Sequence, residues 1–278
     1  MKSKSSIAKV WLTTALAVFF AGCASEKSQK PVSTAERDSL AEAWRIISSK
    51  KFVDLTHTFS PTTPVWPGFG PATFLLAADP ATGRPYTIEH DGFRAFNYSL
   101  VGQYGTHIDP PAHFNVHGKT LDELPVKDML LPLIVFDITP KLHEDPDYAL
   151  RIQDILAWEK VHGRVPAGCF AALRTDMHKD WGTNQNRFKR QPFPAWSFEA
   201  IQFLYEQRGI VANGHESLDT DITPEMKSES WLLDHGHWQI EAMANLDQVP
   251  ATGALIVVAW PKPKNGLGFP VRAFAILP

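Results

Sequence analysis

The chain has 278 residues, a formal net charge of −3 and 44% hydrophobic residues. This length and composition indicate a folded protein with room for one large domain or two small ones. The slightly negative charge argues against a nucleic-acid or anionic-membrane surface as its partner. Nine Trp and 17 Phe occur beside 22 Pro, a mixture typical of short strands, turns and aromatic-lined clefts.

The N-terminus resembles a targeting sequence. Two lysines in the first four residues precede an apolar run at 7–21 that is too short to span a membrane comfortably. Residues 20–23 resemble the lipobox of bacterial lipoproteins, the alternative being an ordinary signal peptide with an incidental cysteine. Ala24 follows the cysteine, as in lipoproteins sent to the outer membrane. We expect 1–23 to be a signal peptide with a lipobox and the mature protein to be periplasmic, attached to the outer membrane only through a lipid on Cys23.

Residues 24–51 are expected to form a polar tether followed by an N-terminal helix. Ser33 and Glu36 have the spacing of a capping box, and apolar residues such as Leu40 and Trp44 recur beyond them at helical spacing.

From residue 52 onward, short apolar runs are separated by Pro and Gly. The patterns predict helices at 151–160 and 197–208, and strands at 53–59, 131–138, 170–175, 209–212, 254–260 and 272–277. This alternation of strands and helices indicates an α/β domain over 52–278.

The stretch 103–114 contains an unusual concentration of polar and special residues. If 100–109 is extended, alternate side chains share one face, namely those of Gln103, Gly105, His107 and Asp109. The two prolines that follow end the strand and deliver His113 from another direction. Each histidine alone is typical of a structural core residue, but an amide, an imidazole and a carboxylate together are costly to bury without a common partner. We interpret the set as a metal site.

Two further polar clusters lie later in the chain. Residues 214–221 include His215 and directly follow a predicted strand, the position at which α/β folds place ligand sites. A solvated acidic turn is the alternative interpretation. Glu241 taken alone has the character of a surface charge.

Residues 105–114 closely resemble the motif His-x-Gly-Thr-His-x-Asp-x-Pro-x-His-Phe of the cyclase-type metal-dependent hydrolases, the family of bacterial kynurenine formamidase and isatin hydrolase. The resemblance extends over 52–278 through Asp54-Leu55-Thr56, Trp66-Pro67-Gly68, Arg174-Thr175 and Glu241 with Asn245-Leu246. It implies an α/β, swivelling β/α/β fold with a β-barrel-like core, assembled as a homodimer or homotetramer. Family members hydrolyse amide bonds of aryl formamides or cyclic amides with Zn²⁺ or Mn²⁺.

The resemblance also implies roles for individual residues. His107 and Asp109 match metal ligands of the motif, and Glu241 matches a carboxylate of the metal centre. His113 matches the histidine that acts as general acid and base. A metal ion held there would lower the pKa of water toward neutrality, and His113 would move its proton to the leaving nitrogen.

Two positions depart from the family pattern. Gln103 occupies the first motif histidine, and Glu229 precedes a Leu-Leu pair where binuclear relatives have a histidine. An amide oxygen in place of imidazole shifts the preference from Zn²⁺ toward Mn²⁺ and from two ions to one, so we expect Mn²⁺ or Zn²⁺, one or two per subunit, with Gln103 as a further ligand. His215 is expected to supply a missing imidazole or to contact the substrate, and Trp66 to contact the substrate.

The sequence therefore predicts an exported metal-dependent hydrolase that acts on a small aryl formamide or an isatin-like cyclic amide. The alternatives are a lactone hydrolase and a periplasmic metal- or ligand-binding protein of the same fold without turnover. A serine hydrolase is disfavoured because the chain has no Gly-x-Ser-x-Gly elbow.

Overall fold

The computed structural model describes residues 34–189, 192–222 and 224–278. The expected signal peptide, lipobox and tether at 1–33 lie outside the described residues. The chain divides into two units, Met1–Arg45 and Ile46–Pro278, and the candidate site lies within the second. None of the helices in the described part of the chain combines the length and the apolar character needed to cross a membrane.

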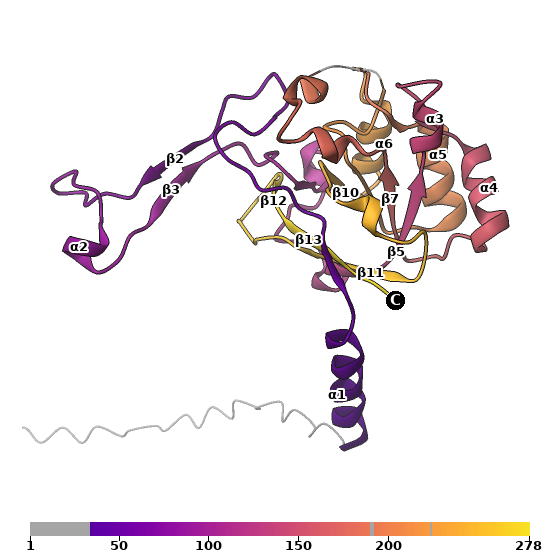
Figure 1. The fold of residues 1–278 in the computed structure, drawn as a ribbon, viewed down its shortest axis with the longest axis horizontal. Coiled ribbons are helices and arrows are strands. Elements are labelled where there is room, and N and C mark those ends of the chain that lie inside the picture. Colours follow the sequence, from indigo (N-terminus) through magenta and orange to yellow (C-terminus); the bar gives the residue numbers. More distant parts are fainter. Residues whose placement is uncertain (1–33, 190–191, 223) are drawn as a thin grey trace, which may run out of the picture. The chain divides into compact units, whose positions relative to one another are not determined.

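The secondary structure is a mixture of short strands and helices (Figure 1). The α-helices are α1 (Thr34–Ser48), α2 (Ile88–Asp91), α3 (Thr139–Leu142), α4 (Ile152–His162), α5 (Phe198–Gln202) and α6 (Lys227–Asp234). The strands are β1 (Phe52–Asp54), β2 (Thr73–Leu76), β3 (Phe96–Ser99), β4 (His107–Asp109), β5 (Leu130–Asp137), β6 (Ala149–Leu150), β7 (Phe170–Arg174), β8 (Ala195–Trp196), β9 (Ala212–His215), β10 (Trp238–Glu241), β11 (Ala254–Ala259), β12 (Phe269–Pro270) and β13 (Arg272–Ile276). Short 3-10 turns occur at Pro111–His113, Val126–Met129, Met177–Asp180, Gln185–Lys189 and Leu246–Gln248.

Nine of these strands form one mixed sheet in the order β1-β13-β11-β5-β7-β9-β10-β4-β12. The four central strands β5, β7, β9 and β10 run parallel, and the strands on both flanks pair antiparallel. The parallel centre requires crossover connections, which α4, α5 and α6 supply.

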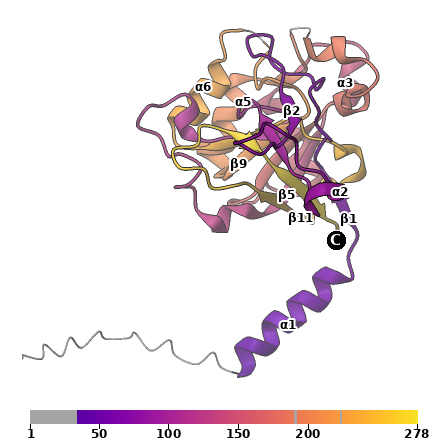
Figure 2. The ribbon, with the colours of Figure 1, turned by 90° about the vertical axis from the view of Figure 1, so that its left-hand side faces the viewer.

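The two faces of the sheet bury different cores. In β5, Leu133 and Val135 belong to one apolar cluster, whereas Ile134 and Phe136 belong to the other. The second cluster also contains apolar side chains of α4, α5 and α6, so these helices cover that face. Figure 2 shows α5 and α6 on the same side of β5 and β9. The near-continuous apolar character of β5 and β7 follows from burial on both faces.

The sheet curls into a half-barrel, which brings the chain after its first strand, β1, to the chain after β10. Beyond β1, Leu55 accepts a hydrogen bond from the backbone N–H of Ala244, and Thr56 forms an isolated antiparallel bridge with Met243. The segment after β1 therefore closes onto the segment after β10. The α/β class and the curled, barrel-like sheet expected from the sequence are confirmed.

The expected extended segment at 100–109 is wrong. Only His107–Asp109 is a strand, and the residues before it form turns. Gly105 has φ +65, a left-handed conformation that interrupts an extended backbone. Gln103 and His107 therefore do not share a strand face.

The helix expected at 197–208 is α5 continued by a π-helical segment, Phe203–Arg208. Gly209, with φ +69, ends it, and the following strand β9 begins at Ala212 rather than at residue 209.

Strands β2 and β3 pair antiparallel as a separate two-stranded sheet, with α2 in the connection between them (Figure 1). Several of its large apolar side chains are exposed, among them Leu75 at 65% and Tyr98 at 60%.

Candidate active site

The candidate site forms where β10 pairs antiparallel with β4. The register places Glu241 opposite His107 and Gln239 opposite Asp109. Directly opposed residues of antiparallel strands point to the same face, and so do residues two apart in one strand. The pairing thus gathers one imidazole, two carboxylates and one amide on a single patch of sheet.

His107, Asp109 and Glu241 form a compact buried cluster. The His107 Nε2 atom lies 3.6 Å from Asp109 Oδ2 and 3.6 Å from Glu241 Oε2. One donor atom from each of the three residues lies within 4.8 Å of the others. The structure therefore brings together three of the four metal ligands expected from the sequence.

A backbone carbonyl group fixes the orientation of the His107 ring. Its Nδ1 lies 2.9 Å from the carbonyl oxygen of Gly105, which can only accept, so Nδ1 carries the proton. Nε2 then faces the two carboxylates and is the ring nitrogen that would bind a metal ion in place of its proton.

The charges at this site perturb each other strongly. Burial opposes the charged form of His107, but Asp109 and Glu241 outweigh burial and raise its pKa to about 9. Burial likewise opposes the Asp109 carboxylate, yet His107 brings its pKa down to about 2. The Glu229 pKa is raised well above its usual range by burial and by the charges of Glu241 and Asp109.

The site carries an excess of negative charge. Asp109, Asp219, Glu229 and Glu241 all line one cavity, and among the described residues that line it none is Lys or Arg. In the protein alone, a proton on His107 offsets part of this charge. A set of buried carboxylates and one imidazole without a basic partner fits a divalent cation.

The cavity has a volume of about 180 Å³, with a polar floor and apolar walls. The walls are formed by Pro64, Trp66, Phe69, Phe114, Leu218 and Met226. Such a shape, with a few convergent polar groups in an apolar cleft, is typical of a small-molecule site.

Trp66 lies on this wall, as expected of a substrate contact, and Gly68 makes its position possible. A Cβ atom at Gly68 would lie 1.3 Å from Cζ3 of the Trp66 indole. The ring therefore covers the Cα of Gly68 and also contacts Phe69, with ring centroids 5.2 Å apart.

His113 reaches the cavity from the 3-10 turn Pro111–His113. The two prolines after β4 end the strand as the sequence predicted, and the turn places His113 on the wall rather than on the sheet face. Its ring packs edge-on against Phe114, with centroids 5.0 Å apart. This position suits a proton-transfer group beside the cluster.

Gln103 lines the cavity but presents its amide nitrogen to the cluster. The Nε2 atom donates to Asp109 Oδ1 at 3.2 Å and to the Leu267 carbonyl at 2.7 Å. Both partners are acceptors, so the amide orientation is defined. In this arrangement Gln103 supports the Asp109 carboxylate, and ligation through its oxygen requires the amide to turn over.

His215 is fully buried. Its Nε2 is 3.4 Å from Glu241 Oε1. The structure thus places His215 against a carboxylate of the cluster, and His215 is not among the described residues that line the cavity. Its expected role, to supply an imidazole or to contact the substrate, stays a prediction.

Two residues of the site were not assigned roles by sequence reasoning. Glu229 enters the cavity from the first turn of α6. The Asp221 carboxylate accepts hydrogen bonds from the backbone N–H groups of Ser228 and Glu229 in that turn. Gln239 is buried beside Glu241. It precedes Glu241 by two residues in the same strand, and this spacing could have predicted that the two side chains share a face.

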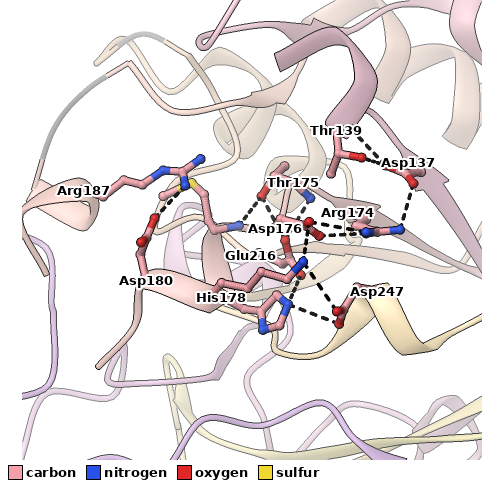
Figure 3. A network of polar contacts seen from close by, with 12 residues as sticks. Asp137, Thr139, Arg174, Thr175, Asp176, His178, Asp180, Arg187, Glu216 and Asp247 are labelled. Atoms are coloured by element: carbon pink, nitrogen blue, oxygen red, sulfur yellow. Dashed lines mark hydrogen bonds and ion pairs between the residues drawn. The ribbon is translucent and has the colours of Figure 1, made fainter. Parts of the chain in front are cut away.

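A second polar network lies beside the site, at the carboxyl ends of β7 and β9 (Figure 3). Thr175 donates its backbone N–H and its hydroxyl to Glu216 Oε2, at 2.8 and 3.0 Å. His178 lies between Glu216 and Asp247, with Nε2 at 3.9 and 3.2 Å from their carboxylate oxygens. Burial raises the pKa of Glu216 to about 7.

Comparison with known proteins places the fold and the site in one family. The sequence model of the Cyclase family matches residues 53–222 of the chain. The isatin hydrolase of Roseibium aggregatum is 31% identical over 250 residues, which cover 81% of this chain and 91% of the relative. The chain belongs to the cyclase family, and within it to the metal-dependent hydrolases.

Two solved structures of relatives have the same fold. Isatin hydrolase A from Labrenzia aggregata, bound to benzyl benzoate, superimposes with a TM-score of 0.75 at 30% identity, covering 87% of this chain and 99% of the relative. An isatin hydrolase bound to the product analogue thioisatinate gives 0.76 at 26% identity, covering 89% and 100%.

Proposed function

We propose that this protein hydrolyses the amide bond of a small cyclic amide of the isatin type or of an aryl formamide. The observation that carries the proposal is the buried His107–Asp109–Glu241 cluster on the floor of an apolar-walled cavity, with His113 on the wall. A relative that covers most of the chain is an isatin hydrolase, which supports an amide ring as the substrate.

The cavity walls favour a flat aromatic substrate. Trp66, Phe69 and Phe114 present ring surfaces to the cavity. Aromatic side chains pack well against a planar ring in offset or edge-on arrangements. A fused ring would lie between these walls with its carbonyl toward the carboxylate cluster.

The residues that would hold the cation are His107, Asp109 and Glu241, with Glu229 within reach in the same cavity. Oxygen donors outnumber nitrogen donors in this set, which favours Mn²⁺ over Zn²⁺. We propose one or two ions per subunit. When bound, such a cation polarises a carbonyl group and makes water more acidic.

His113 performs the proton transfers in this proposal. A neutral imidazole accepts a proton from the attacking water and then returns it to the leaving nitrogen as the amide bond breaks. Gln103 holds Asp109 in place during this step through its 3.2 Å hydrogen bond. The apolar walls exclude bulk water from the reacting carbonyl.

A panel of substrates tests the proposal. Purified protein with added Mn²⁺ or Zn²⁺ is assayed with isatin, N-formylanilines and aromatic lactones, and ring opening or formate release is followed by absorbance or pH indicator. Turnover of the amides supports the proposal. Turnover of lactones alone assigns a lactone hydrolase, and tight metal binding with no turnover assigns a binding protein.

We also propose that the chain forms a homodimer or homotetramer. The exposed apolar side chains of the β2–β3 hairpin, including Leu75, Phe96 and Tyr98, support an interface there. Light scattering after size-exclusion chromatography is expected to give an oligomer, and a Leu75→Asp/Tyr98→Asp double variant is expected to shift it toward the monomer.

Finally, we propose that the protein is exported and anchored by a lipid on Cys23. The lysines, the apolar run and the lipobox-like residues 20–23 support this localisation. Metabolic labelling with palmitate is expected to mark the wild-type chain in the outer-membrane fraction, and Cys23→Ser is expected to lose the label.

A further inference from the structure

Gln239 lies at the centre of the carboxylate cluster and is completely buried. Its Nε2 atom lies 3.3 Å from Asp109 Oδ2, 3.2 Å from Glu229 Oε1 and 3.2 Å from Glu241 Oε1. One side-chain amide therefore faces all three carboxylates at hydrogen-bond distance.

The other end of the amide is held by Thr220. The Thr220 hydroxyl donates to Gln239 Oε1 at 2.5 Å, and Thr220 is itself fully buried. Because the Asp109 and Glu241 carboxylates can only accept, the NH₂ group must face them, and the Thr220 hydroxyl stabilises that orientation by occupying the amide oxygen. The amide oxygen is thereby withheld from the cluster.

This arrangement sets which oxygen of Glu241 faces His107, whereas Asp109 turns one and the same oxygen, Oδ2, toward both Gln239 and His107. Glu241 gives Oε1 to Gln239 and keeps Oε2 on the His107 side, 3.6 Å from Nε2. The amide brings two hydrogens to three carboxylates, so it reduces their mutual repulsion without neutralising it. The remaining charge is available to a cation.

We propose that Gln239, locked by Thr220, is a positioning pair that orients Asp109, Glu229 and Glu241 for a divalent cation. Gln239 does not itself ligate in this arrangement, since its oxygen is bonded to Thr220. The inference rests on the cation site of the proposed function, because the orientation has this meaning only if a cation binds there.

The test measures Mn²⁺ affinity and requires no substrate. Thr220→Val keeps the shape of the side chain but removes the hydroxyl, so the amide is free to turn its oxygen toward the carboxylates. Groups that orient metal ligands typically change affinity by about 10–100-fold, and a loss in that range is expected for Thr220→Val by electron paramagnetic resonance titration. Thr220→Ser keeps the hydroxyl, and its Mn²⁺ affinity is expected to lie within about threefold of wild type, a much smaller change than the loss expected for Thr220→Val.

Gln239→Met provides a second variant that is independent of Thr220. It has similar length and no donor, and the same loss of about 10–100-fold is expected. Circular dichroism and melting of the metal-free proteins identify any variant that fails to fold, and either variant that folds suffices for the measurement.

Mn²⁺ affinities of the folded variants within threefold of wild type would overturn the inference, even if melting temperatures fall, since that pattern marks a purely structural role. Thr220→Ser as weak as Thr220→Val would overturn it too. The wild-type protein could hydrolyse none of the substrate panel while the variants still bind Mn²⁺ more weakly. That result would support the inference and remove only the proposed function. If the wild-type chain bound neither Mn²⁺ nor Zn²⁺, both the inference and the proposed function would be removed.

Discussion

Glu241 lies directly opposite His107 in the antiparallel pairing of β10 with β4, and its Oε2 atom is 3.6 Å from His107 Nε2. The two residues are far apart in the sequence and become neighbours because β4 and β10 pair in the sheet. Sheet register alone makes them partners. Changes to this pair and to its neighbours therefore have distinct, measurable consequences.

Removing a ligand is expected to remove the metal. Asp109→Ala and Glu241→Ala each delete a carboxylate of the cluster. The loss of affinity should exceed the roughly 100-fold that is typical when a group hydrogen-bonded to a metal ligand is removed. Metal content by mass spectrometry after dialysis checks this. Glu144→Ala, which alters an exposed carboxylate, is the control, and retained metal in both ligand variants would exclude these residues as ligands.

His113→Ala is expected to separate binding from chemistry. His113 is on the cavity wall and outside the three-residue cluster, so bound metal should remain. Loss of a proton-transfer group lowers the rate by about 10²–10⁴-fold. Steady-state kinetics at equal metal occupancy measure the effect. Wild-type kcat in this variant would exclude His113 from proton transfer.

Gly68→Ala is expected to weaken substrate binding without affecting the metal. The new Cβ would overlap the Trp66 indole at 1.3 Å, so the ring must leave the wall. Loss of one aromatic contact, about 0.5–1.5 kcal/mol, corresponds to a rise in KM of about 2- to 10-fold. Gly70→Ala is the matched control, because a Cβ there meets nothing within 4 Å. Equal KM values for the two variants would argue against a substrate contact by Trp66.

Glu216 is expected to make stability depend on pH. Burial raises its pKa from 4.5 to about 7 in the folded protein, so the folded state binds the proton more tightly than the unfolded chain. The resulting stabilisation is complete below pH 4.5 and is lost as the pH rises through 7. The shift corresponds to roughly 3 kcal/mol.

Glu216→Gln tests this contribution. The amide oxygen can still accept from Thr175, but the group no longer titrates. Denaturant unfolding at pH 5 and pH 8 should show a smaller decrease in the variant than in wild type. An identical decrease in both proteins would mean that Glu216 is ionised throughout this range.

Chelation is expected to lower thermal stability. A ligand present at 100 times its dissociation constant stabilises the folded state by about 2.7 kcal/mol, which corresponds to several degrees in Tm. Differential scanning fluorimetry with Mn²⁺ and then with excess chelator checks this. Asp109→Ala should show no such difference; a chelator effect of equal size in that variant would locate the stabilising ion elsewhere.

Much of the fold was predictable because local patterns report burial directly. The apolar runs of β5 and β7 are continuous because both faces of those strands are covered, and the strand predictions at 131–138 and 170–175 agree with them. The extended segment at 100–109 was mispredicted because a glycine at positive φ leaves no clear trace in an alternating pattern.

The sequence by itself determined the chemistry of the motif: His107 and Asp109 two residues apart, two prolines to end the strand, and His113 beyond them. Spacing within one short segment fixes such geometry through backbone stereochemistry alone. The family motif already implied Glu241 as a carboxylate of the metal centre. Only the tertiary structure decided that Glu241 lies opposite His107, that Gln239 joins the same patch, that Glu229 enters from α6, and that Gln103 presents its nitrogen to Asp109. Those relationships depend on strand register and on hydrogen-bond partners distant in the chain, which local sequence does not encode.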